Sequence, residues 1–160
     1  MGAHVFYELA SGVAMPFASL VGPAPAAAAW ATSTALVFHT ACRGKDVHNN
    51  AFGLINGMFL TAVLAHFIYW PKRWIFGVPW LTECEGLRGN LLAPYNAILY
   101  VSGVAAVAGL VENGRGGVRG AVIPPVFVPV LLRIQGIEFR RLRAQARRRP
   151  AWWNRRLQVG

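Results

Sequence analysis

Long apolar segments, separated by short clusters of charge, constrain this chain more than any other feature of its sequence. Five such segments lie at about residues 3–21, 26–42, 51–70, 91–111 and 121–137. Only 14% of the 160 residues are charged, whereas soluble domains carry about 25%. A soluble domain of this size needs more polar surface. The sequence therefore predicts an all-α fold, namely a polytopic transmembrane helical bundle.

The number of spans depends on segment length and on proline. A transmembrane helix needs about 20 apolar residues, with about 17 as the lower limit. The third and fourth segments pass easily, whereas the first, second and fifth are short. Proline kinks or ends a helix, and it interrupts the first segment at Pro16 and the fifth at Pro124, Pro125 and Pro129. We expect five spans within residues 1–137; the alternative is four, with part of residues 1–42 re-entrant or at the interface.

The positive charge is concentrated in the C-terminal tail, residues 138–160, and just before it. Nine of the sixteen basic residues lie between Arg133 and Arg156. The positive-inside rule places this tail in the cytoplasm. Arginines beside anionic lipid, with Trp152 and Trp153 at the head-group level, account for its composition. We therefore expect an integral membrane protein with a cytoplasmic C-terminus and membrane lipids, rather than nucleic acid, as its partner.

The few acids are the most informative polar residues, because a charge in hydrocarbon costs about 2.5–3.5 kcal/mol. The expected topology brings Glu8, His39 and Asn56 towards the outer leaflet, together with Glu112 at the end of the fourth segment. A carboxyl group at that depth has a raised pKa and holds a proton near neutral pH. We therefore predict Glu8 and Glu112 as catalytic proton donor and acceptor, with His39 and Asn56 as supporting residues.

The third segment carries a polar stripe. Asn56, His66 and Trp70 share one face at the helical period of 3.6 residues. Gly53 and Gly57 form a GxxxG pair on an adjacent strip, which permits close helix contact. The stripe therefore predicts either substrate-supporting residues, with His66 and Trp70 among them, or hydrogen bonds between helices.

The connection between the third and fourth segments, residues 69–86, is rich in tryptophan and proline. This composition is typical of an amphipathic segment that lies in the membrane interface. Glu83 and Glu85 then lie at the membrane surface, and Tyr95 and Asn96 begin the fourth segment beside them. Glu83 and Glu85 are predicted either to form a surface ion pair with Arg88 or to belong, with Tyr95 and Asn96 beside them, to a ledge that accepts a lipophilic substrate from the bilayer.

Motifs for metals and cofactors are missing from the sequence. Cys42 and Cys84 match no metal-binding spacing, and neither a phosphate loop nor an HExxH pattern occurs. We therefore expect no metal and no cofactor.

Scattered acids, histidines, amides and aromatic rings within helices are compatible with an enzyme that isomerises or cyclises a lipophilic molecule, because aromatic faces stabilise carbocations. Our leading hypothesis is such an enzyme of lipid, terpenoid or secondary-metabolite biosynthesis, acting by acid–base chemistry. One alternative is a non-catalytic accessory or scaffold subunit of a larger membrane enzyme or of a homo-oligomer. A further alternative is a small transporter or channel subunit, although such proteins usually show repeated halves.

Overall fold

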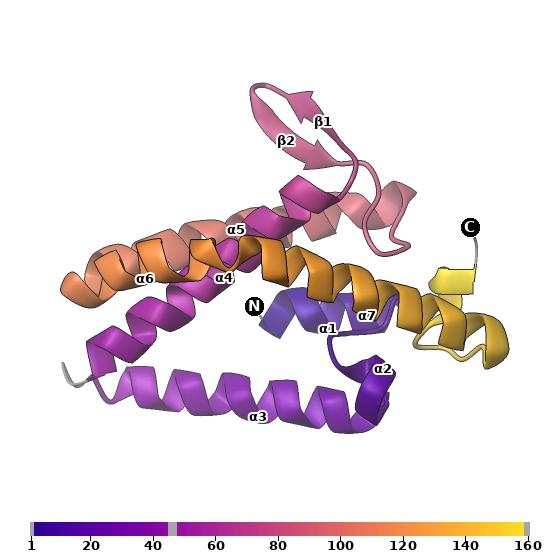
Figure 1. Cartoon of the computed structure of the whole chain (residues 1–160), viewed down its shortest axis with the longest axis horizontal. Coiled ribbons are helices and arrows are strands. Elements are labelled where there is room, and N and C mark those ends of the chain that lie inside the picture. Colours follow the sequence, from indigo (N-terminus) through magenta and orange to yellow (C-terminus); the bar gives the residue numbers. More distant parts are fainter. Residues whose placement is uncertain (1, 45–47, 159–160) are drawn as a thin grey trace.

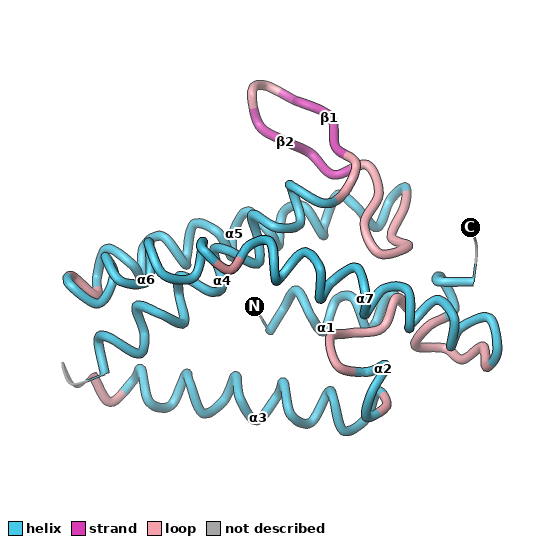
Figure 2. The backbone as a smooth tube through the Cα atoms, viewed as in Figure 1, coloured by secondary structure: helices cyan, strands magenta, loops and turns pink. Residues whose placement is uncertain are grey.

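The structure is a computed structural model of the chain, and it describes residues 2–44 and 48–158. The described residues are largely helical, and one β-hairpin projects from the helices (Figures 1 and 2). The helices are α1 (Gly2–Ser11), α2 (Ala18–Val21), α3 (Pro23–Cys42), α4 (Asn49–Tyr69), α5 (Leu92–Glu112), α6 (Arg115–Val126) and α7 (Val128–Arg148), with strands β1 (Lys72–Ile75) and β2 (Val78–Leu81) and 3-10 helices η2 (Gly89–Leu91) and η3 (Arg155–Gln158).

Among the described residues, two helical segments are long and apolar enough to cross a membrane. They are α4, with 21 residues, and η2 with α5, with 24 residues over Gly89–Glu112. Helices α6 and α7 bend by 57° at their junction and supply a third span if the bent pair counts as one. The all-α class is therefore confirmed, and the third and fourth predicted segments are helices. Five spans are not confirmed.

The first predicted span is not a single helix, and the second is a helix, α3, that is not among the candidate spans. Helix α1 ends at Ser11, and Ala14 and Phe17 then adopt left-handed backbone conformations with φ of 75° and 70°. Ten residues of helix are about 15 Å long, half of the thickness of a bilayer core. Helix α3 has 20 residues, but its proline, threonine, serine and histidine residues leave it outside the described helices that are apolar enough to cross.

Proline also divides the fifth predicted span. Pro124 and Pro125 lie at the end of α6, Phe127 separates the two helices, and Pro129 lies in the first turn of α7. Proline suits a first turn because the amide proton it lacks has no helical partner there. Helix α7 then continues to Arg148, so the predicted boundary between bundle and tail at residue 137 falls inside one helix.

Helices α4 and α6 pack through glycines, which we call the glycine interface: Gly53 and Gly57 of α4 against Gly116 and Gly120 of α6. A methyl group added at Gly53 would lie 2.0 Å from the Gly116 carbonyl oxygen, and one at Gly57 would lie 1.9 Å from that of Gly120. The two backbones are therefore in direct contact, as small residues permit. The GxxxG strip is covered by α6 and is not an open docking surface.

The aromatic connection after α4 forms an antiparallel hairpin, where the sequence indicated only an interfacial segment. Its two turn residues, Phe76 and Gly77, both have positive φ, 49° and 79°, as a type I′ turn requires. Trp74 and Phe76 at the tip are 68% and 103% exposed. The side-chain amide of Asn96 holds the base, because its Oδ1 accepts a hydrogen bond of 2.9 Å from the Leu81 amide.

Candidate functional site

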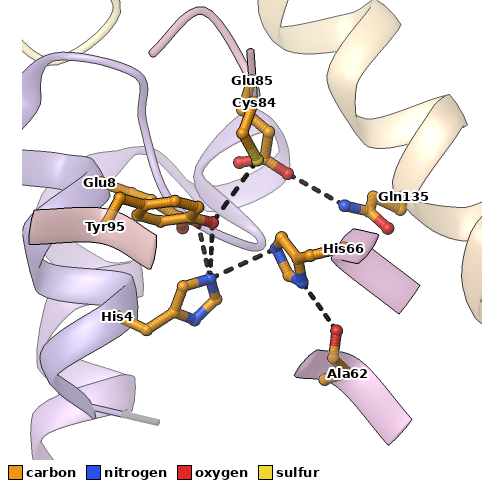
Figure 3. A network of polar contacts seen from close by, with 8 residues as sticks. All are labelled: His4, Glu8, Ala62, His66, Cys84, Glu85, Tyr95 and Gln135. Carbon is orange, nitrogen blue, oxygen red and sulfur yellow. Dashed lines mark hydrogen bonds and ion pairs between the residues drawn. The ribbon is translucent and has the colours of Figure 1, made fainter. Parts of the chain in front are cut away.

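Five polar side chains from distant parts of the chain meet inside the protein, and we call them the buried centre. His4 and Glu8 come from α1, His66 from α4, Tyr95 from α5, and Cys84 from the segment between β2 and η2 (Figure 3). Glu8 is 1% exposed and Tyr95 is fully buried. Buried polar groups of this kind persist only when they are hydrogen-bonded to one another.

Glu8 receives two hydrogen bonds at one carboxylate oxygen. The Tyr95 hydroxyl donates to Glu8 Oε1 at 2.6 Å, and His4 Nε2 lies 2.8 Å from the same oxygen. His4 Nε2 also lies 2.9 Å from the Tyr95 hydroxyl. His4 and Glu8 are one turn apart on α1, so both side chains leave the same face of the helix.

His66 has a defined tautomer when its ring is neutral. Its Nδ1 lies 2.7 Å from the carbonyl oxygen of Ala62, which only accepts, so Nδ1 carries the proton. The lone pair on His66 Nε2 then faces His4 Nε2 at 3.3 Å. Cys84 extends the network, because its thiol donates to the Tyr95 hydroxyl at 3.6 Å. The result is a continuous chain of hydrogen-bonding groups that runs from Cys84 through Tyr95 and His4 to His66 (Figure 3).

Burial sets the protonation of the two α1 groups. It raises the pKa of Glu8 from 4.5 to about 7, against the opposing effects of His66 and of the hydrogen bond from Tyr95. Burial also lowers the pKa of His4 from 6.5 to about 4. Near neutral pH, the protonated and ionised forms of Glu8 are therefore both populated, and His4 is a neutral hydrogen-bond donor. This is the protonation expected of a general acid.

The pKa of Glu8 is directly measurable by infrared spectroscopy in detergent. We expect a carboxylic acid band that disappears as the pH rises, with an apparent pKa of about 7. The Glu8→Gln variant should lose the component of this band that titrates near pH 7 and keep that of Glu85, whereas Glu112→Gln should keep both components. A spectrum with no such titration between about pH 5 and 9 would contradict the protonated carboxyl group.

A second carboxyl group borders the buried centre. Glu85 follows Cys84, is half-buried and accepts a hydrogen bond of 3.4 Å from Gln135 Nε2 of α7 (Figure 3). Burial, and secondly the negative charge of Glu8, raise the pKa of Glu85. The titration of Glu85 therefore depends on the charge of Glu8.

Among the described residues, one group resembles a metal site: His4, Glu8 and His66. Each offers one ligand atom, and the three atoms lie within 4.8 Å of one another. Two imidazoles and one carboxylate are a ligand set for zinc or iron. However, His4 Nε2 and Glu8 Oε1 are 2.8 Å apart. Ligands at about 2.0–2.1 Å from zinc in a tetrahedral site are roughly 3.3 Å apart. The observed spacing is that of a shared proton.

The structure brings together several of the residues singled out in the sequence. Glu8, His66 and Tyr95 belong to the buried centre, and Glu85 lies at its edge. Trp70 is buried but packs edge-on against Phe139 of α7, with ring centroids 4.9 Å apart. The side chain of Asn96 is occupied by backbone groups at the base of the hairpin.

Other predicted residues lie elsewhere. His39 is exposed on α3, and Asn56 is half-buried on α4, beside Gly109 of α5. Glu83 forms an exposed ion pair of 2.7 Å with Arg88. Glu112 is exposed at the C-terminal end of α5.

Glu112 and Glu8 therefore do not form a pair in this structure. Tyr95, which contacts Glu8, lies in the first turn of α5, whereas Glu112 is its last residue. At 1.5 Å per residue, the two positions are about 25 Å apart along the helix axis. The proton-bearing groups next to Glu8 are instead His4 and Tyr95.

Sequence reasoning missed two members of the buried centre. His4 carried a usable signal, since an acid and a histidine four residues apart share a helix face. Cys84 carried none. It reaches the centre through a tight turn in which Glu85 and Gly86 both have positive φ, 50° and 91°, while Cys84 and Leu87 exchange backbone hydrogen bonds.

Comparison with protein families, with curated proteins and with solved structures finds no match to this chain. The class of protein therefore has to be inferred from the fold and from the site. In the part of the chain that is described, two or three helical segments are long and apolar enough to cross a membrane, and two of them, α4 and α5, contribute His66 and Tyr95 to the buried centre.

Proposed function

We propose that this chain is a small integral membrane enzyme that performs acid–base chemistry, of isomerase or cyclase type, on a lipophilic substrate. The observation that carries the proposal is the 2.6 Å hydrogen bond from Tyr95 to the buried carboxyl group of Glu8. A carboxyl group whose pKa is shifted by burial, and which has positioned proton-bearing neighbours, is typical of an acid–base site.

The distribution of side chains supports membrane insertion. The interior holds His4, Glu8, His66 and Asn96, while large apolar side chains are exposed along the helices. A water-soluble protein rarely exposes contiguous apolar surface of this extent, whereas lipid solvates it. The exposed apolar residues include Leu36, Phe38, Met58, Leu64, Ile68, Val101, Val104, Val107, Val118, Val122, Val126, Val130 and Ile134.

Membrane insertion predicts a fractionation result. The chain should remain in the membrane pellet after an alkaline carbonate wash, because its exposed apolar surface is stable only in lipid. A C-terminal tag should become accessible to protease only from the cytoplasmic side, as the arginines before it require. Release by carbonate, or protease access from the outer side, would contradict insertion or orientation respectively.

The buried centre suggests a proton-balanced reaction. Protonated Glu8 gives its proton to the substrate, and the resulting carboxylate accepts hydrogen bonds from Tyr95 and His4. The substrate cation rearranges and returns one proton to Glu8, so the reaction needs no co-reactant. The rings of Tyr7 and Tyr95, 6.1 Å apart, offer aromatic faces to such a cation.

Entry of the substrate requires movement, since Glu8 is 1% exposed. Either α1 or the segment that carries Cys84 has to shift, which couples catalysis to opening of the site.

Metabolite profiles of host cells test the proposal. Cells that express the wild-type chain should accumulate a lipophilic product isomeric with a host or supplied precursor, and cells that express Glu8→Gln at the same level should not. Identical profiles across a panel of terpenoid and lipid precursors would count against an enzyme. Co-purification of both proteins with a larger membrane enzyme would then favour an accessory subunit.

A further inference from the structure

An arginine-lined cleft lies on the other side of the turn that carries Cys84. Its volume is about 430 Å³, and its lining residues are Gly86, Arg88, Arg155 and Arg156. The first two follow β2, and the last two belong to η3, which begins more than sixty residues later in the chain. The fold therefore gathers three guanidinium groups at one surface site.

The two arginines of η3 are held against the end of α1. Arg156 donates through Nε to the Ser11 carbonyl oxygen at 2.8 Å, and its amide donates to the Gly12 carbonyl oxygen at 3.0 Å. A side chain at Gly12 would meet Arg155 Cγ and Nε at 2.9 Å. Helix α1, which supplies His4 and Glu8, thus positions both arginines as well.

The turn Cys84–Leu87 is shared by the cleft and the buried centre. Its Cys84 thiol contacts Tyr95 inside the protein. Its Gly86 lies against the backbone of Arg156, where an added methyl group would be 3.0 Å from the carbonyl oxygen. A molecule that binds in the cleft and extends past this turn therefore approaches the buried centre.

We propose that this cleft binds the phosphate or diphosphate end of the lipophilic substrate, while the apolar part of the molecule reaches the buried centre. Guanidinium groups match phosphate oxygens with paired, charge-assisted hydrogen bonds. Glu83 neutralises one of the three arginines, Arg88, through an ion pair of 2.7 Å. The remaining two positive charges equal the charge of a phosphate group, about −1.5 to −2 at neutral pH. This inference names the substrate class and rests on the proposed function.

Inorganic pyrophosphate is the probe for this site. We expect it to bind the purified wild-type chain saturably in neutral detergent, as measured by calorimetry and by a rise in the melting temperature. The Arg155→Gln/Arg156→Gln variant should bind at least about tenfold more weakly, because a hydrogen bond to a charged group contributes about 1.5–3 kcal/mol. Arg115→Gln/Arg119→Gln, on α6, removes the same charge from a distant surface and should bind normally.

Since Arg156 also holds η3 in place, the single variant Arg155→Gln keeps the test valid if the double variant does not fold. Equal weakening by both double variants, or no saturable binding to the wild-type chain, would overturn the proposal.

Nanodiscs distinguish the source of the phosphate group. If phosphatidate or phosphatidylglycerol in the disc abolishes pyrophosphate binding, the cleft holds a bilayer lipid and the substrate assignment is wrong.

The two proposals fail separately. If the cleft does not bind pyrophosphate, Glu8→Gln should still abolish product formation. If Glu8 is not the proton donor, pyrophosphate should still bind in the cleft, because binding is measured without turnover.

Discussion

Replacement of Gly57 by alanine is expected to destabilise the protein strongly, because the added methyl group would push α4 away from α6. The new methyl group would lie 1.9 Å from the backbone carbonyl oxygen of Gly120, which cannot move without displacing α6. Overpacking of this kind costs about 2–3 kcal/mol. The melting temperature in detergent should fall by roughly 5–10 °C, and the α6–α7 pair should become sensitive to protease.

Gly103→Ala on α5 is the matched control. Its methyl group would lie 3.6 Å from Val63 Cγ1, an ordinary contact. Alanine also favours the helical conformation over glycine by up to about 1 kcal/mol, so this variant should melt at the wild-type temperature or above it. Equal melting of the Gly57→Ala and Gly103→Ala variants would show that α4 and α6 are not in backbone contact.

Glu8→Gln is expected to lower kcat by about 10²–10⁴-fold, the contribution of a positioned general acid. Glutamine has nearly the same shape and still accepts the hydrogen bond from Tyr95, so the loss should fall on kcat with little change in KM. Tyr95→Phe should lower kcat by about 10²-fold, because it removes one donor that stabilises the carboxylate after proton transfer.

Two variants control for these effects. Tyr100→Phe removes a hydroxyl that bonds to the Pro79 carbonyl oxygen of the hairpin, away from Glu8, and should leave kcat unchanged. Glu112→Gln distinguishes the two assignments of the second proton-bearing group. Full activity of Glu112→Gln supports Tyr95 and His4 as the partners of Glu8, whereas a loss matching that of Glu8→Gln would restore the pair of acids indicated by the sequence.

Several features of the fold follow from local sequence. The long, charge-free and mainly apolar runs near residues 51–70 and 91–111 predict long helices, because a backbone surrounded by apolar side chains must satisfy its own hydrogen bonds. Glu8 was identifiable because it is a lone acid among apolar residues. The hairpin was not, since its turn has Phe76 at a positive φ, a position where asparagine or glycine would have given the signal.

The glycine interface shows the limit of a motif. Gly53 and Gly57 indicated a close helix contact, but only the structure identifies its partner as α6 of the same chain. The choice depends on the turn after α5, where Gly114 adopts a φ of 51° and allows α6 to begin directly. Local spacing contains no information about which distant backbone fills such a strip.

The sequence by itself determined the long apolar helices and singled out Glu8 as an acid among apolar residues, since both inferences depend on the cost of placing polar groups in an apolar environment. The tertiary structure alone decided that Tyr95 and His66 join Glu8 and His4. Tyr95 is 87 residues from Glu8, and His66 is 62 residues from His4. Contacts over such separations depend on how helices pack, which no local pattern encodes. Once packing places Tyr95 beside Glu8, the length of α5 holds Glu112 about 25 Å away along the helix axis.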